Sequence, residues 1–82
     1  MSIDSIEQKV IDILNGITGA QPGEIDPDLA LFDEGLLDSF ATIQMVLALE
    51  EGFGLHLEIS ELSREQMATP AKLARTIGGM LS

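Results

Sequence analysis

Several residue types are missing or rare in this chain. Cysteine, tryptophan and tyrosine are absent from the 82 residues, and phenylalanine occurs three times. Without cysteine the chain forms no disulfide and offers no thiolate as a nucleophile or metal ligand. Because aromatic rings are so few, aliphatic and methionine side chains have to fill the interior. No run approaches the roughly 20 apolar residues that a membrane-spanning helix requires, so we expect no membrane insertion.

Basic residues are also scarce. Four Lys and Arg stand against 14 Asp and Glu, which gives a formal net charge of −10. Every charged residue between Val10 and Ser63 is acidic. Such a chain repels nucleic acid phosphates and anionic lipids, and it attracts partners with basic surfaces. A strong negative charge also serves solubility alone, so charge by itself identifies no partner.

The size and apolar content predict one small folded domain, residues 1–82. Apolar residues make up 45% of the chain, which favours a packed core over disorder. A chain of this length buries roughly 60% of its unfolded surface, which makes an enclosed catalytic pocket hard to build. The first residues do not resemble a signal peptide. We therefore expect a cytoplasmic monomer that is not an enzyme.

The periodicity of apolar residues predicts four helices and no strand. From residue 3 to residue 17 they recur at spacings of three and four, as on one face of a helix. A second helix is expected over 39–51 and a short third one near 63–68. The last begins at Pro70 after a Thr69 cap. The predicted fold is all-α, a bundle of three long helices and one short helix.

A long loop is expected between the first two helices. Residues 19–37 contain prolines, glycines and several acids but no helical periodicity. Loops of this length in compact domains are often functional. A helical turn is expected around residues 29–32. Six apolar side chains should fix the loop to the core: Ile25, Leu29, Leu31, Phe32, Leu36 and Leu37.

A serine directly follows an aspartate where this loop meets the second helix. Asp38 is a natural N-cap, and Ser39 falls in the first helical turn. Taken alone, the pair favours simple capping, because both residue types are common at helix starts. The loop, however, delivers Ser39 to a helix tip that a partner enzyme can reach. A helix N-terminus also stabilises an anion joined to such a hydroxyl.

The residues around this junction resemble the acyl carrier protein family. The matching segments are FDEGLLDSF at 32–40, the apolar helix after it, LEEGFG at 49–54 and Thr69-Pro70. The resemblance covers nearly the whole chain. It implies that Ser39, with Asp38 beside it, receives 4′-phosphopantetheine from coenzyme A through a phosphopantetheinyl transferase. The thiol of that arm would hold acyl or aminoacyl groups as thioesters.

The resemblance also implies the other partners. An acyl- or aminoacyl-adenylating ligase would load the arm, and a downstream acyltransferase or synthase would accept the cargo. Carriers of fatty acid synthesis place acids just after the serine, where this chain has Ala41 and Gln44. The loop and helix start are closer to D-alanyl and other free-standing aminoacyl carriers. Fatty acid or polyketide carriers are alternatives, as is a helical interaction module without a prosthetic group.

The second predicted helix has two apolar stripes, and so small a bundle cannot bury both fully. The stripe around Met45 and Leu49 fits the core. The other, Phe40, Ile43 and Leu47, is expected to be a docking face or to line a groove for the cargo. The expected partner-contact residues are Glu34, Phe40, Ile43, Gln44, Leu47, Glu50 and Glu51.

Two other kinds of site fit the sequence poorly. A serine hydrolase needs a base and a glycine two residues after the serine, but the sole histidine is His56 and Ala41 occupies that position. The segment DPD at 26–28 begins like a calcium-binding loop, but Leu31 replaces the required glycine. We expect no metal site of this type, although weak divalent binding by the acidic loop is left open.

Overall fold

The computed structural model describes residues 2–21 and 23–81, and these residues contain three α-helices and no strand. The helices are α1 (Ile3–Thr18), α2 (Ser39–Phe53) and α3 (Pro70–Leu81). Two short 3₁₀ turns, η1 (Ile59–Glu61) and η2 (Glu65–Met67), lie between α2 and α3. The all-α class predicted from the sequence is therefore confirmed. No described helix is both long enough and apolar enough to span a bilayer.

The short third helix expected near 63–68 is not an α-helix. The structure has the three-residue turn η2 in its place, so α-helices number three in the described residues rather than four. The physical reason lies in Pro70, which opens α3. A proline disfavours helical backbone in the residue before it, so a helix over 63–68 has no room to lengthen before α3 starts.

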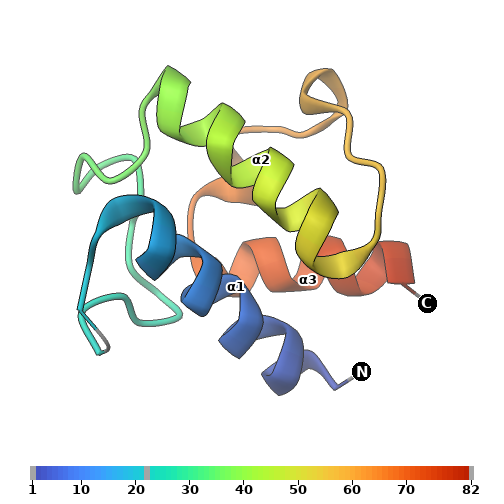
Figure 1. Ribbon diagram of the computed structural model, residues 1–82, viewed down its shortest axis with the longest axis horizontal. Helices are drawn as coiled ribbons and strands as arrows, with labels where there is room; N and C mark the ends of the chain where they lie inside the picture. Colours follow the sequence, from blue (N-terminus) through green and yellow to red (C-terminus); the bar gives the residue numbers. More distant parts are fainter. Residues whose placement is uncertain (1, 22, 82) are drawn as a thin grey trace.

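Helix α1 packs against both of the other helices, as Figure 1 shows. The end of α3 reaches the start of α1, since Gly78 lies against the side chains of Ile3 and Ile6. The core takes residues from all three helices, and Leu57 and Met67 extend it. Its fully buried members include Val10, Leu14, Met45, Val46, Leu49, Leu73, Ala74 and Ile77.

The segment between α1 and α2 is held to the core by its apolar residues, as predicted. Ile25, Leu31 and Leu37 are buried, while the other three members of the predicted set pack against the core from partly buried positions. The amide of Leu31 donates to the carbonyl of Ala68 at 2.9 Å. This contact ties the segment to the residues just before α3.

Each helix begins at a polar cap. The Ser2 side chain accepts from the Ser5 amide in α1, and the Thr69 hydroxyl accepts from the Lys72 amide in α3. Helix α2 runs through Gly52 to Phe53, past its expected end at residue 51. A Cβ at position 52 would lie 3.0 Å from Cδ1 of Ile13, so this glycine permits close packing of α2 on α1.

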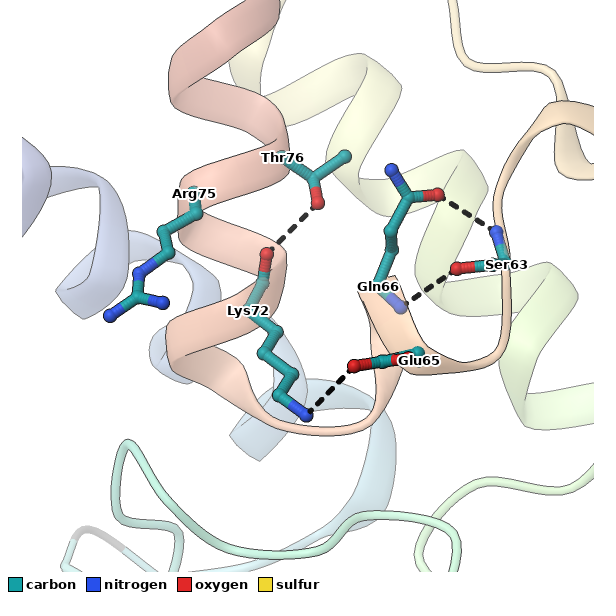
Figure 2. Close-up of a pocket in the computed structure, with 6 residues that line it drawn as sticks. All are labelled: Ser63, Glu65, Gln66, Lys72, Arg75 and Thr76. Carbon is teal, nitrogen blue, oxygen red and sulfur yellow. Dashed lines mark hydrogen bonds and ion pairs between the residues drawn. The ribbon is translucent and has the colours of Figure 1, made fainter.

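The residues before α3 form a small polar network, shown in Figure 2. The Ser63 amide donates to the Gln66 side chain at 2.8 Å, and the Gln66 amide donates to the Ser63 hydroxyl at 3.1 Å. Lys72 of α3 lies 3.8 Å from the Glu65 carboxylate. These contacts satisfy local polar groups and connect η2 to α3, which places Arg64 and Met67 beside the start of α2.

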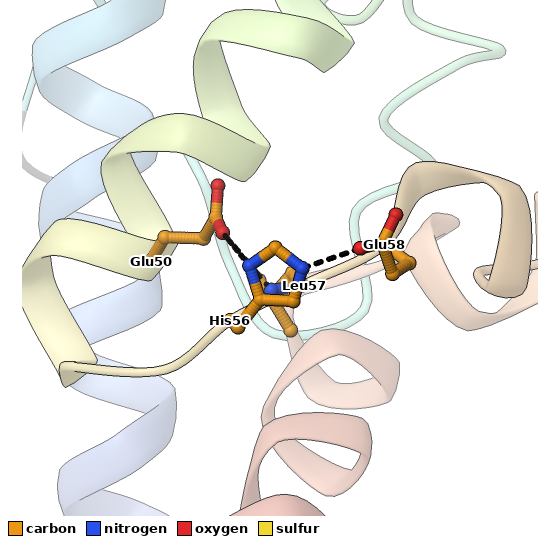
Figure 3. Close-up of polar contacts among 4 residues, drawn as sticks. All are labelled: Glu50, His56, Leu57 and Glu58. Atoms are coloured by element: carbon orange, nitrogen blue, oxygen red, sulfur yellow. Dashed lines mark hydrogen bonds and ion pairs between the residues drawn. The ribbon is translucent and has the colours of Figure 1, made fainter.

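A histidine and two glutamates hold the chain where it leaves α2 (Figure 3). His56 Nδ1 lies 3.2 Å from the Glu50 carboxylate, and its Nε2 contacts Glu58. The Glu50 carboxylate also accepts the Leu57 amide at 3.1 Å. The hydrogen bond with Glu58 and the charge of that carboxylate raise the pKa of His56, and Glu50 raises it further. The cluster thus favours the charged imidazole.

Two leucines of α2 provide a matched test of which side of the helix is core. We predict that Leu49→Ala lowers the free energy of unfolding by about 2–5 kcal/mol, because Leu49 is 1% exposed and its loss leaves a cavity. Leu47→Ala should cost about 0.5 kcal/mol or less. Urea denaturation of both variants measures the difference. Equal losses of unfolding free energy in the two variants would show that Leu47 is buried in the core and not exposed.

The His56 cluster predicts a pH-dependent contribution to stability. A pKa raised in the folded state stabilises the fold below the unfolded value of about 6.5, and the stabilisation disappears as the pH rises through the folded pKa. We therefore expect His56→Gln to lower the melting temperature more at pH 5.5 than at pH 8.5. Ser60→Ala, a non-ionising control in the same segment, should change the melting temperature equally at the two pH values. A His56→Gln effect independent of pH contradicts the prediction.

Candidate functional site

Ser39 is the first residue of α2, and its side chain is exposed. The capping role belongs to Asp38, whose carboxylate accepts the Ala41 amide at 2.8 Å. The Thr42 hydroxyl donates to the carbonyl oxygen of Asp38 at 2.6 Å. Within residues 2–21 and 23–81, the Ser39 hydroxyl has no hydrogen-bond partner. Capping therefore leaves this hydroxyl available for chemistry.

An open hollow of about 530 Å³ adjoins Ser39. We call it the Ser39 hollow. Its apolar wall comes from three parts of the chain: the segment before α2, α2 itself, and the η1–η2 region. A single base, Arg64, lines it, together with Asp38, Ser39 and Thr42 as its other polar residues. The complete lining is Phe32, Leu37, Asp38, Ser39, Thr42, Ile43, Ile59, Arg64 and Met67.

The second apolar stripe of α2 faces solvent. Phe40 is 69% exposed, Leu47 59% and Ile43 48%, whereas Met45 and Leu49 are in the core. This agrees with the prediction that one stripe is exposed. The stripe also touches the hollow, because Ile43 lines it, so the apolar face and the hollow form one continuous surface beside Ser39.

The polar residues expected at the partner surface differ in their exposure and in their position along α2. Glu34, Gln44 and Glu51 are exposed. Glu50 is half-buried, and its carboxylate is already engaged with His56 and the Leu57 amide. Glu34 precedes the start of α2, whereas Glu51 is near its other end. The predicted set therefore spans the length of the helix and does not form one cluster.

Three residues of the Ser39 hollow were not found from the sequence: Ile59, Arg64 and Met67. Ile59 is an exposed apolar residue of η1. The Arg64 guanidinium lies over the Phe32 ring, 4.2 Å from its centroid. The available signal was that Arg64 is the first base after a long acidic stretch. Its place beside Ser39 depends on contacts between segments far apart in the chain.

The histidine and the segment that begins like a calcium-binding loop both lie in local contacts away from Ser39. Ser39 and Glu50 are about 16 Å apart along α2, from its rise per residue, and His56 contacts Glu50. His56 is therefore too distant to act as a base for Ser39. Asp26 accepts the amide of Asp28 at 2.9 Å, which is a local turn contact. The described residues contain no group of three or more acidic, His or Cys side chains suited to a metal ion.

The residues around Ser39 fit a phosphopantetheine arm. Such an arm needs an accessible hydroxyl as its anchor, and the Ser39 oxygen is exposed and without a partner in the described chain. The phosphopantetheine arm also carries apolar methyl groups and amides. The hollow offers an apolar wall with polar groups at its edge. The site therefore offers an accessible hydroxyl and, beside it, a surface on which the first part of such an arm could lie.

Comparison with known proteins agrees with this geometry. A sequence profile for the family described as "Phosphopantetheine attachment site" matches residues 8–77. The D-alanyl carrier protein of Lacticaseibacillus casei (strain BL23) is 41% identical over 73 residues, 89% of this chain and 90% of the relative. The D-alanyl carrier protein of Lactobacillus acidophilus (strain ATCC 700396 / NCK56 / N2 / NCFM) is 41% identical over 71 residues, which cover 87% of this chain and 89% of the relative.

A third relative extends the agreement. The D-alanyl carrier protein of Enterococcus faecalis (strain ATCC 700802 / V583) is 36% identical over 73 residues, 89% of this chain and 94% of the relative. The profile match includes the loop, α2 and most of α3, and it indicates a covalently attached 4′-phosphopantetheine. The chain therefore belongs to the family of carrier proteins with a phosphopantetheine attachment site.

Proposed function

We propose that Ser39 is the residue that carries the 4′-phosphopantetheine arm and that the chain is an aminoacyl carrier, with D-alanine as the first candidate cargo. The observation that carries the assignment is the Ser39 hydroxyl, exposed at the start of α2 and without a partner in the described chain. Asp38 supports it by capping the helix, so the serine is not needed for that purpose.

The attachment step follows from the chemistry of coenzyme A. The Ser39 oxygen attacks the phosphorus next to the pantetheine part, a new P–O bond forms, and the bond to 3′,5′-ADP breaks. A phosphopantetheinyl transferase supplies the base that takes the hydroxyl proton, because His56 is too distant and the Asp38 carboxylate is engaged with the Ala41 amide. When attached, the arm supplies a thiol that holds the cargo as a thioester. The chain's own residues then anchor and present that arm.

The choice of an aminoacyl cargo is supported by the relatives, which are named D-alanyl carrier proteins. An amino acid joined as a thioester keeps a positively charged ammonium group. Arg64 in the Ser39 hollow disfavours burial of that charge, so the aminoacyl end of the arm would stay in solvent. There an adenylating ligase can load it and a downstream transferase can remove it.

We further propose that Phe40, Ile43 and Leu47 form the face that these enzymes contact. Exposed apolar side chains on one helix face are the usual basis of such docking. No charged residue lies between Asp38 and Glu50, so apolar contacts dominate along the middle of α2. Glu34 and Glu51 would add a charged rim, and Gln44 a polar contact within the face, whereas Glu50 is already engaged with His56 and Leu57.

The attachment residue can be tested by intact mass. Incubation with coenzyme A and a broad-specificity phosphopantetheinyl transferase should add one phosphopantetheine to the wild type and none to Ser39→Ala. Ser60→Ala, which removes another exposed serine hydroxyl, should be modified like the wild type. If the wild type gains no mass while a known carrier is fully converted, the chain is better explained as a helical interaction module.

The contact face can be tested by transfer kinetics on the modified protein. We predict that Phe40→Ala or Leu47→Ala lowers kcat/KM for loading by a partner ligase about five- to thirty-fold, the range for residues at the centre of an interface. The reason is loss of apolar contact with the ligase, since neither side chain is in the core. Stability should change little in both variants.

Met80→Ala is the matched control for the contact face. It removes a similarly exposed apolar side chain from α3, away from α2, and should leave loading unchanged. Equal kinetic losses in the α2 and α3 variants would show that general surface hydrophobicity, rather than this face, determines loading.

A further inference from the structure

Arg64 is the one base that lines the Ser39 hollow. Its guanidinium is held over the Phe32 ring at 4.2 Å from the centroid. In the part of the chain that the structure describes, no carboxylate forms an ion pair with it. A fixed positive charge without an anionic partner, in a chain with net charge −10, calls for a physical explanation.

Three acids share a hollow with Arg64, and none of them forms an ion pair with it in the described chain. Asp38 lines the same hollow, but its carboxylate accepts the Ala41 amide. Asp33 and Glu65 line a neighbouring hollow that Arg64 shares, and Glu65 lies 3.8 Å from the Lys72 ammonium. Asp38 is therefore the one acid among the residues that line the Ser39 hollow, and its carboxylate caps α2.

Modification of Ser39 would change this balance. The phosphodiester formed there carries one negative charge, adjacent to the like charge of Asp38, and it lies in the same hollow as Arg64. A guanidinium is well suited to phosphate oxygens, because its planar donors can bind two of them at once. Contact with the Phe32 ring limits the freedom of the Arg64 side chain, which lowers the entropic cost of forming the pair.

We propose that Arg64 pairs with the phosphodiester that joins the arm to Ser39 and thereby directs the first part of the arm across the Ser39 hollow. Arg64 is thus a positioning residue of the modified protein. The apolar groups of Ile43, Ile59 and Met67 would receive the geminal methyl groups of the arm. This inference rests on the proposed function, because it requires the attachment at Ser39.

Nuclear magnetic resonance of the unmodified and modified protein tests the pairing. Wild type, Arg64→Gln, Arg64→Lys and Arg75→Gln are converted fully with coenzyme A and a transferase, and intact mass confirms the conversion. Arg75 is the matched control, an exposed arginine of α3 that lines the separate hollow in Figure 2. In wild type and Arg75→Gln, modification should shift the Arg64 side-chain NH signal, and this shift should diminish in high salt.

The arm itself gives a second readout. In wild type and Arg75→Gln, the geminal methyl protons of the arm should show cross-relaxation with the methyl groups of Ile43 and Ile59. Arg64→Gln should weaken these signals about two- to fivefold, the factor expected for an exposed charge pair. Arg64→Lys keeps the charge without the planar donors and should lie between the two.

The outcomes separate the two proposals. If none of the variants gains the arm, the proposed attachment at Ser39 is wrong and the role of Arg64 falls with it. If all are modified, but Arg64 does not respond and the arm signals are equal in Arg64→Gln and Arg75→Gln, only the pairing is wrong. Spectra of the unmodified variants verify that each keeps the wild-type fold.

Discussion

The hydrogen bond from the Ala41 amide to the Asp38 carboxylate is the contact on which the rest of the site depends. A helix start needs acceptors for its first amides, and one residue here meets that need with its side chain. The next residue, Ser39, is then held at the tip of α2 by the helix backbone while its hydroxyl has no partner in the described chain. Asp38 therefore caps the helix, and the neighbouring Ser39 hydroxyl stays available for chemistry.

Helix α2 carries apolar residues on two sides because it serves two surfaces. One side, with Met45, Val46 and Leu49, completes a core shared with α1 and α3. The other, with Phe40, Ile43 and Leu47, is exposed beside Ser39. Apolar exposure of this kind has a cost in solubility, which the large negative charge of the chain offsets. The core and the proposed partner contacts thus use different faces of one helix.

The charge beside Ser39 differs in sign from the charge of the chain as a whole. The acidic stretch that ends before Ser63 repels other anions, yet Arg64 brings one positive charge to the hollow beside Ser39. The Ser63–Gln66 and Lys72–Glu65 contacts connect the residues around Arg64 to α3. The phosphodiester proposed at Ser39 would therefore have an attractive charge close by, although the chain as a whole is strongly negative.

Sequence reasoning identified the three α-helices, the Asp38 and Thr69 caps, the buried loop residues and the exposed stripe of α2. All of these depend on interactions within a few residues, or on an apolar period that a single segment displays. The short helix expected near 63–68 is present only as the 3₁₀ turn η2, and the second helix extends past its expected end at residue 51. The contacts of Gly52 with Ile13 and of Arg64 with Phe32 join residues far apart in the chain, and no local pattern encodes which distant segments meet. Only the packing of the folded chain decided that Arg64 and Ser39 share one hollow.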